Sequence, residues 1–182
     1  MNNLSDKEIL NMCRADNSSS YGFNLLVKKY QQKIYWIVRR ILINHEDTND
    51  VVQNIFVKVW ENINNFREDS KLYTWLYRIS TNEALLFLKK KKLKATLNFD
   101  NYEHKLINEL QDDNFFAGDE IQMKLQKAIL SLPVKQKLVF NMKYYDDLKY
   151  KEIAEILNTS VGALKASYHF AVKKIEKYII DN

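Results

Sequence analysis

Apolar residues recur at steps of three and four along most of this chain, which is the spacing of an amphipathic α-helix. One such stretch covers residues 23–43 and a second covers residues 51–63. A third predicted helix begins near Lys71, after a polar loop. Because each stretch has one apolar face, the helices can share a core, and they predict a first helical domain over residues 1–94.

Capping signals set the expected ends of these helices. Ser5 and Glu8 have the spacing of a capping box, which predicts a short first helix. The stretch Ser-Ser-Ser-Tyr-Gly at residues 18–22 indicates a break before the long helix. Residues 44–50 are rich in Asn and Asp and are predicted to form a turn before the helix at residue 51.

The rest of the chain predicts a linker and a second domain. Residues 95–120 show no sustained period and are predicted to be a flexible linker, whereas helical spacing returns over residues 121–182. Pro133 fits the first turn of a helix, where its missing N–H is tolerated. The expected fold is therefore all-α, with two small helical domains joined by a flexible linker.

The last two predicted helices have the spacing of a helix-turn-helix. Asn158 and Thr159 would make the turn, and Ser160 is a good N-cap for the final helix. The apolar face of that helix would hold Val161, Leu164, Tyr168, Val172 and Ile175, which leaves Ala163, Lys165, Ala166, His169 and Lys173 outside. In a helix-turn-helix such a surface enters the major groove of DNA. An ordinary helical hairpin with a solvated lysine face is the alternative.

Composition and charge agree with a helical, polyanion-binding chain. The 182 residues include 3 Gly and 1 Pro, too few for a turn-rich fold. The net charge is +5, but residues 95–120 hold seven acidic residues and one lysine, a net charge of −6. The remainder therefore carries +11, in two basic parts on either side of an acidic connector. Basic parts of this kind suit a nucleic-acid partner.

Several classes of protein are disfavoured. Cys13 is the single cysteine, so no disulfide framework or thiolate metal cluster is expected. The N-terminus has no apolar signal core, and no run approaches the ~18 apolar residues of a membrane span, so we expect a soluble, cytoplasmic protein. His45, His104 and His169 stand in unrelated contexts, without metal-ligand spacing or a glycine-rich phosphate loop. We therefore expect no catalytic residue, metal, cofactor or small-molecule substrate.

Residues 65–92 combine aromatic and polar side chains with a run of lysines. Some of the apolar residues here, including Trp75, must be core. We expect others to be exposed, as an array of rings, hydroxyl, guanidinium and amide groups: Tyr73, Thr74, Tyr77, Arg78 and Asn82. Such an array suits unstacked bases, each of which offers a face for stacking worth ~1–3 kcal/mol. The lysines would neutralise phosphates. A fully core-packed helix is the alternative.

Two long stretches resemble a known family. "NDVVQNIFVKVWENI…FREDSKLYTWLYRISTNEALLFLKKKK" and "LPVKQKLVFNMKYYDDLKYKEIAEILNTSVGALKASYHFAVKKIEKYI" are similar to the two domains of bacterial sigma-70-family factors, most of all the small extracytoplasmic-function (ECF) type. The resemblance covers nearly the whole chain in the right order. It implies an alternative sigma factor that binds core RNA polymerase, recognises promoter DNA and opens it.

The resemblance also assigns residues. It implies that one helix docks on the clamp helices of the polymerase β′ subunit, through Asp50, Gln53, Phe56 and Trp60. It implies that a loop and helix melt the promoter and hold single-stranded bases of the −10 element, through Phe66, Arg67, Ser70, Lys71, Tyr73, Thr74, Trp75, Tyr77, Arg78, Asn82, Lys89 and Lys90. It implies −35 recognition and contact with the polymerase β flap by the second domain, with DNA contacts from Ser160, Ala163, Lys165, Ala166, Ser167, His169, Lys173 and Lys174.

The chain departs from the family pattern at several positions. Asn54 stands where an acidic residue often follows the glutamine of the docking helix. In the last helix Ala166, Ser167 and Phe170 replace a serine and two arginines, which predicts weaker or more shape-dependent −35 readout. The family also makes an anti-sigma partner plausible. A conventional helix-turn-helix regulator, which acts without replacing a polymerase subunit, is the alternative function.

Overall fold

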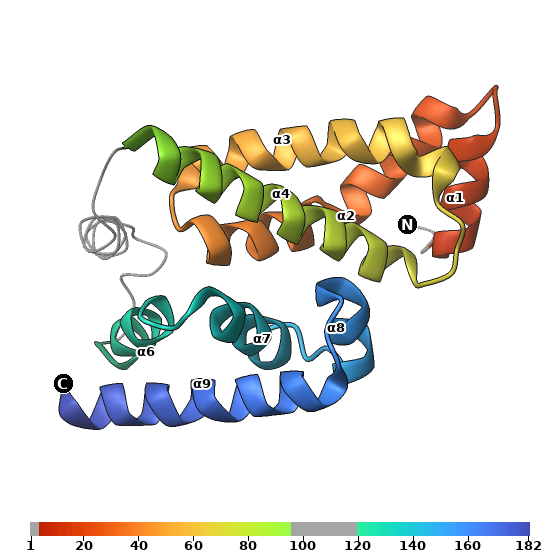
Figure 1. Ribbon diagram of the computed structural model, residues 1–182. Coiled ribbons are helices and arrows are strands. Elements are labelled where there is room, and N and C mark those ends of the chain that lie inside the picture. Colours follow the sequence, from red (N-terminus) through yellow and green to blue (C-terminus); the bar gives the residue numbers. More distant parts are fainter. Residues whose placement is uncertain (1–3, 96–119) are drawn as a thin grey trace. The chain divides into compact units, whose positions relative to one another are not determined.

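The computed structural model describes residues 4–95 and 120–182, and every regular element in these ranges is a helix (Figure 1). The all-α fold expected from the sequence is confirmed for this part of the chain. Apart from its two end residues, the linker predicted over 95–120 lies outside the described residues. Contacts divide the chain into two units, residues 1–88 and 89–182, which are described separately.

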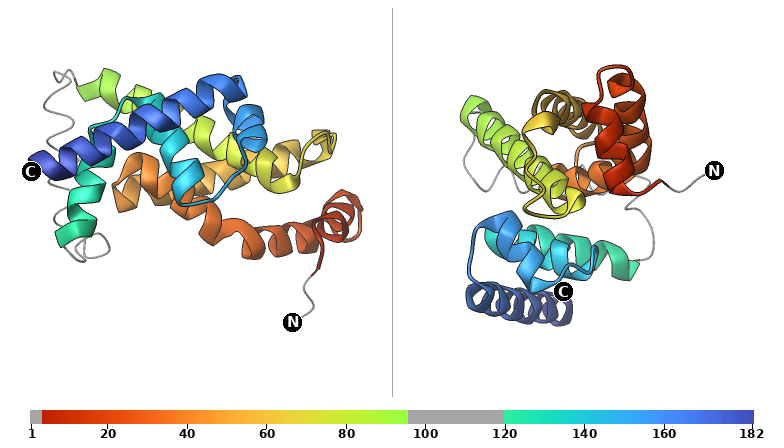
Figure 2. Two further views of the ribbon diagram at one scale, coloured as in Figure 1. Left: turned by 90° about the horizontal axis from the view of Figure 1, so that it is seen from below. Right: turned by 90° about the vertical axis from the view of Figure 1, so that its right-hand side faces the viewer.

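In its described residues, the first unit is built from four α-helices and a short 3-10 turn. Helix α1 contacts both α2 and the 3-10 turn, and α2 contacts α3 along its length (Figures 1 and 2). The helix α4 continues past the unit boundary at Leu88 to its end at Ala95. The elements are α1 (Asp6–Arg14), α2 (Ser19–Leu42), α3 (His45–Asn62), η1 (Ile63–Asn65) and α4 (Leu72–Ala95).

The predicted capping box at the start of α1 is confirmed. The Ser5 hydroxyl accepts a hydrogen bond from the Glu8 N–H at 3.3 Å, and the Ser5 N–H donates to a Glu8 carboxylate oxygen at 2.8 Å. These two bonds satisfy backbone donors that a helix end would otherwise leave free. The Ser5 hydroxyl also donates to this carboxylate oxygen at 2.6 Å. This bond, followed by the bond from the Ser5 N–H, lowers the pKa of Glu8, since both favour its charged form.

The break predicted over residues 18–22 is wrong in its position. Helix α2 begins at Ser19, so Gly22 lies inside the helix. A Cβ atom on Gly22 would lie 2.5 Å from the Cys13 nitrogen and 2.6 Å from the Met12 carbonyl carbon. Gly22 therefore allows the close approach of α1 to α2, and it does not mark the end of a helix.

The turn predicted over residues 44–50 is also shorter than expected. Asn44 caps α3, since its side-chain oxygen accepts from the Asp47 N–H at 2.9 Å, and the helix starts at His45. One residue before the cap, Ile43 is buried with φ 65. A positive φ is rare for a β-branched residue, and here it points the side chain into the core.

The core of the first unit draws on all four α-helices. Its buried members include Ile9, Leu10, Leu26, Ile34, Val38, Ile55, Val59, Ile63 and Leu76. Three small residues of α4, namely Ser80, Thr81 and Ala84, are buried as well. The Ser80 hydroxyl donates to the Leu76 carbonyl at 2.8 Å, so its burial leaves that donor satisfied.

The second unit packs three helices along one long helix. Helix α9 contacts α6, α7 and α8 (Figures 1 and 2). Its core joins Ala128, Ile129, Leu132 and Phe140 to Ala171 and Ile175 of α9. Within residues 120–182 the helices are α6 (Glu120–Leu130), α7 (Val134–Tyr144), α8 (Tyr150–Leu157) and α9 (Val161–Asp181).

The helix-turn-helix predicted at the C-terminal end is present. Asn158 ends α8 in the left-handed conformation, with φ 47 and ψ 53, which asparagine tolerates better than most residues. Ser160 caps α9 by accepting from the Ala163 N–H at 3.3 Å. Leu164 and Ile175 of the predicted apolar face are buried, and Val161, Tyr168 and Val172 are half-buried.

Candidate nucleic-acid interface and docking groove

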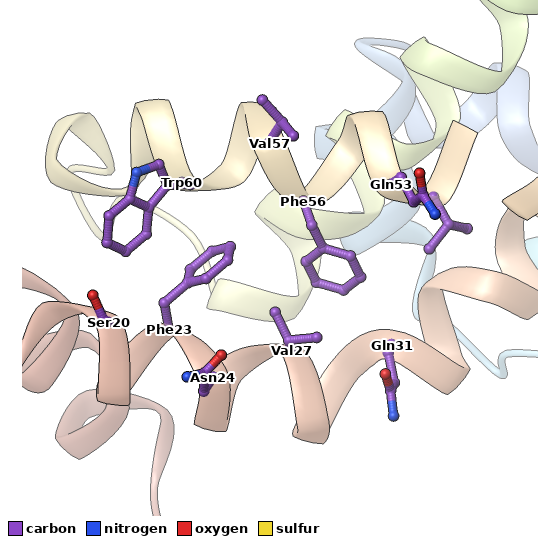
Figure 3. Close-up of a pocket in the computed structure, with 10 residues that line it drawn as sticks. Ser20, Phe23, Asn24, Val27, Gln31, Gln53, Phe56, Val57 and Trp60 are labelled. Carbon is purple, nitrogen blue, oxygen red and sulfur yellow. The ribbon is translucent and has the colours of Figure 1, made fainter. Parts of the chain in front are cut away.

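An open apolar groove of about 620 Å³ runs between α2 and α3 (Figure 3). Phe23 of α2 lies between two aromatic residues of α3: its ring centroid is 6.4 Å from that of Phe56 and 4.9 Å from that of Trp60, both at edge-on angles. Val27 of α2 and Val57 of α3 extend the apolar lining. Trp60 and Val57 remain 42% and 55% exposed, so a large apolar surface faces solvent.

Predicted docking residues line this groove or lie next to it. Phe56, Trp60 and Gln53 line it, and Gln53 adds a polar group to its rim (Figure 3). Asp50 is exposed one turn before Gln53 on the same helix. The sequence did not indicate the contribution of Phe23 and Val27 from α2, because a single helical period cannot tell which neighbouring helix completes a surface.

A polar and basic stripe runs along α4. Lys71, directly before α4, and Arg78, Asn82 and Lys89 within it are exposed, and their steps of seven, four and seven residues keep them on one side. Lys90 is exposed beside them. Their hydrogen-bond donors are spread along about five helical turns. Donors in such a row can contact successive phosphates and base edges of single-stranded DNA.

Four residues of the predicted −10 set are buried. Phe66, Thr74, Trp75 and Tyr77 are 6%, 5%, 9% and 2% exposed. The expected exposure of Thr74 and Tyr77 is therefore wrong, whereas Trp75 is core, as one reading of the sequence had it. The reason is local packing: the ring of Trp75 lies 4.9 Å from that of Phe66, and Tyr77 packs edge-on against Tyr73 at 5.8 Å.

Tyr73 is the aromatic residue of the predicted set that remains half-buried. Its ring stacks on that of Tyr30 in α2, with centroids 6.1 Å apart and planes 16° apart. The ammonium group of Lys33 lies 5.4 Å from the Tyr73 centroid, within the range of a cation–π contact. Lys33 therefore adds a positive charge from α2 that inspection of residues 65–92 could not reveal.

The loop between η1 and α4 is fixed from α1. Arg14 forms an ion pair with Glu68 at 2.6 Å and also donates from Nη2 to the Phe66 carbonyl oxygen. Arg67 and Asp69 pair at 3.2 Å within the loop and are largely exposed. Ser70 is half-buried at the end of this loop.

The predicted −35 residues lie along α9 and at its start. Ser160, Ala163, Lys165, Ala166, His169, Lys173 and Lys174 are exposed, and Ser167 is half-buried. Phe170 is 55% exposed beside His169, with ring centroids 5.9 Å apart. The outer face of α9 thus has lysines at both ends of a patch of small and aromatic side chains.

Burial perturbs two ionisable groups in the first unit. Desolvation, with the hydrogen bond that the Tyr30 hydroxyl donates to Asp6 at 2.7 Å as a second cause, raises the pKa of Tyr30 far above its ordinary value. Burial likewise raises the pKa of the Cys13 thiol. Both groups stay protonated and neutral at pH 7, so they act as packing residues.

Within residues 4–95 and 120–182, no group of three or more His, Cys, Asp or Glu side chains is arranged to hold a metal ion. None of the helices described is long and apolar enough to cross a membrane.

Comparison with known proteins supports a family assignment. The model of Sigma-70 region 2 matches residues 26–93, and that of Sigma-70, region 4 matches residues 122–175. The chain is 32% identical over 168 residues to the ECF RNA polymerase sigma factor SigW of Bacillus subtilis (strain 168), which covers 88% of this chain and 90% of SigW. It is 30% identical over 174 residues to the ECF RNA polymerase sigma-E factor of Escherichia coli (strain K12), with 91% of each chain covered.

Solved structures share the fold. CnrH in complex with the cytosolic domain of CnrY matches with a TM-score of 0.70 and 19% identity, over 97% of this chain and 98% of CnrH. The sigma factor RpoE in complex with the anti-sigma factor NepR, from Bartonella quintana, matches with a TM-score of 0.65 and 18% identity, over 86% and 96%. With these two sigma-70 regions in order and relatives matched over nine tenths of their length, the chain belongs to the ECF type of the sigma-70 family of RNA polymerase sigma factors.

Proposed function

We propose that this chain is an alternative sigma factor that binds core RNA polymerase, selects promoters by their −35 and −10 elements and opens the DNA. The observation that carries the proposal is the presence of three different surfaces on a chain of this family: an apolar groove, a basic stripe and a helix-turn-helix. The role requires binding and strand separation but no covalent chemistry. The relatives in the comparison are sigma factors, which supports this reading.

The groove between α2 and α3 is the proposed docking surface for the β′ clamp helices. An apolar groove formed by two helices is well suited to receive a further helix, and an exposed tryptophan is the kind of residue that dominates binding energy. Asp50 and Gln53 add polar groups beside it, which would orient the partner. The departure at Asn54 removes one charge from this surface and leaves the apolar lining intact.

The stripe on α4 is the proposed −10 surface. Arg78 and Asn82 can donate to base edges and phosphates, and Tyr73 offers a ring to an unstacked base. Lys71, Lys89 and Lys90 add positive charge along the path of the backbone. Phe66, Thr74, Trp75 and Tyr77 would then act by supporting this surface from beneath, since their side chains are buried.

The outer face of α9 is the proposed −35 surface. A recognition helix contacts base edges through its N-terminal half, which here carries Ala163 and Ala166. Small apolar side chains of this kind contact thymine methyl groups, while Lys165 and Lys173 are placed for phosphates. Contact between this unit and the polymerase β flap completes the proposed assembly.

The proposed role places the chain in the cytoplasm, with the polymerase. The partner of RpoE in the solved structure is an anti-sigma factor, and CnrH is bound to a cytosolic domain of CnrY. We infer that an anti-sigma factor also controls this chain, by covering one of its polymerase-binding surfaces.

The test adds the purified chain to core RNA polymerase and measures binding and promoter-dependent transcription on genomic fragments. Trp60→Ala should weaken binding to the core enzyme by about 30-fold, the effect of about 2 kcal/mol. Tyr21→Ala is the matched control, because Tyr21 is a 62% exposed aromatic residue on α2 that does not line the groove. Equal losses in the two variants would contradict the docking assignment.

Failure of the unaltered chain to bind core polymerase, combined with tight binding to duplex DNA alone, would favour the alternative of a conventional helix-turn-helix regulator. The comparisons do not favour that alternative, because the region 2 match extends over residues that such a regulator does not need.

A further inference from the structure

Helix α1 ends beside the loop that leads into the proposed −10 surface. Its last residue, Arg14, uses two nitrogens on two parts of that loop: Nη1 pairs with Glu68 at 2.6 Å, and Nη2 donates to the Phe66 carbonyl oxygen. The guanidinium is half-buried and its Nε atom is shielded from solvent. A planar fork of donors suits such a double contact better than a single ammonium group does.

The loop that Arg14 contacts has an unusual backbone. Glu68 has φ 61, a left-handed conformation that costs free energy in a residue other than glycine. Residues held in such a conformation persist where surrounding contacts over-determine it. The ion pair to Arg14 is such a contact, since it fixes the Glu68 side chain from a residue 54 positions earlier.

The same arrangement fixes which residues of the loop face outward. Phe66 is buried against Trp75, and the Arg14 bond holds its carbonyl oxygen. Arg67 and Asp69, on either side of Glu68, are 85% and 75% exposed at their side chains. The loop is thus tied at Phe66 and Glu68 and presents its other groups to solvent just before the first turn of α4.

We propose that Arg14 is a positioning residue for promoter opening: it holds residues 66–70 in the shape that receives an unstacked base. This inference rests on the proposed function. It adds a residue of α1, which lies outside the stretch matched by Sigma-70 region 2. Without Arg14, Glu68 relaxes to an ordinary conformation, and the loop must be ordered again each time that a base enters it.

Holding a loop in its bound shape increases affinity by removing the ordering cost from the binding step. Loss of Arg14 should therefore reduce the part of the DNA affinity that comes from the captured base. It should not reduce the affinity for core polymerase. Loss of Arg14 should reduce that contribution whether the template is duplex or already single-stranded, because the loop contacts the base itself.

The experiment uses the full chain on core polymerase and single-stranded oligonucleotides of the non-template −10 element. An abasic site is moved along the element, and the ratio of affinities with and without each base is measured. In the unaltered chain, one position should show a large ratio. Arg14→Gln should lower that ratio by about tenfold, equivalent to about 1.4 kcal/mol, while binding to core polymerase changes by less than about twofold.

Lys29→Gln is the matched control. Lys29 pairs with Asp6 at 2.8 Å and donates to the Leu4 carbonyl at 2.8 Å, so it also joins one carboxylate and one backbone oxygen, but at the other end of α1. It should lower thermal stability about as much as Arg14→Gln and leave the base ratio unchanged. Glu68→Gln should behave like Arg14→Gln, and the double variant should lose little more than either single variant.

An unchanged base ratio in Arg14→Gln would overturn the inference, and so would equal falls in Arg14→Gln and Lys29→Gln. A ratio near one at every position in the unaltered chain would overturn it as well. If the unaltered chain does not bind core polymerase at all, the proposed function fails instead, so the two failures are distinguishable.

Discussion

Some single residues in this chain have structural roles that cannot be predicted from their residue type alone. Gly22 is the clearest case, because it lies within a helix and yet cannot be replaced without moving α1. The backbone atoms of Met12 and Cys13 lie under 3 Å from the place of a Cβ atom. Backbone atoms cannot rotate away as a side-chain tip can.

We predict that Gly22→Ala destabilises the chain by about 1–3 kcal/mol, the usual cost of overpacking. Gly162→Ala is the control, since no atom lies within 4 Å of its Cβ position in α9, and alanine is the better helix former there. Urea unfolding followed by circular dichroism measures both. A Gly22→Ala variant as stable as the Gly162→Ala variant would contradict the close approach of the two helices.

A pH dependence follows from Tyr30. Its pKa is raised in the folded chain, chiefly by desolvation, so folding favours the protonated phenol. That contribution to stability is complete below the unfolded pKa of about 10 and is lost as pH rises above it. The raised pKa of Cys13 has the same effect: its contribution to stability is lost as the pH rises above about 9.

We predict that the free energy of unfolding falls on raising the pH from 9 to 11, and that Tyr30→Phe makes this fall shallower. At pH 7 the same variant should lose about 0.5–1.5 kcal/mol, because the hydrogen bond to Asp6 is removed. Tyr21→Phe, at an exposed position of the same helix, should leave the whole profile unchanged. Identical alkaline slopes in Tyr30→Phe and the unaltered chain would contradict the assignment.

At the scale of elements, sequence reasoning succeeded where the determining contacts are local. The Ser5–Glu8 capping box, the Asn158 turn and the Ser160 cap each depend on residues within four positions, and all three are present. The lengths of α2 and α3 were less well predicted. Gly22 and the stretch after Asn44 look like turn signals, but tertiary packing and a single cap keep both inside helices.

Helix α4 shows why the candidate site could be predicted only in part. Its buried residues include hydroxyl-bearing and aromatic side chains such as Thr74, Thr81 and Tyr77, which occur on surfaces as readily as in cores. The small residues Thr74, Thr81 and Ala84, at steps of seven and three, were a usable signal of a buried face. The contacts of Arg14 with residues 52 and 54 positions away carry no local signal at all.

The exposed stripe of α4 gives a prediction for strand separation. Arg78→Ala and Asn82→Ala should each slow open-complex formation on duplex promoters by about tenfold, and should affect pre-melted templates less. The reason is that contacts with unpaired bases offset the free-energy cost of separating the strands. In a pre-melted template the strands are already separated, so this cost is absent. Fluorescence of a base analogue in the −10 element reports opening. Gln32→Ala, at an exposed position on α2, is the control.

Equal losses on duplex and pre-melted templates would mean that these residues contribute to binding only. Circular dichroism should show unchanged folding in both variants, because Arg78 and Asn82 are exposed.

At the scale of the whole molecule, the proposed −10 surface on α4 and the proposed −35 surface on α9 are separated in the sequence by residues 95–120, which carry a net charge of −6. Within the described residues, each proposed DNA surface carries only a few exposed basic side chains. Binding of both units to one promoter therefore depends on a partner that holds them at the right separation.

We predict that the free chain binds duplex promoter DNA weakly and with little sequence preference, and that core polymerase increases the specificity by at least about 100-fold. Fluorescence anisotropy with specific and scrambled duplexes, at a fixed salt concentration, measures the ratio. Tight, specific binding by the free chain would contradict the need for the polymerase.

The groove lined by Phe23, Phe56 and Trp60 has a practical consequence for the chain before it meets any partner. Newly made copies present this patch to one another and to unfolded proteins, so overproduction without an equal supply of polymerase should lead to precipitation. The yield of soluble chain should then fall as the ratio of chain to polymerase rises. Degradation of the excess chain, or a partner that covers the groove, would prevent this precipitation in the cell.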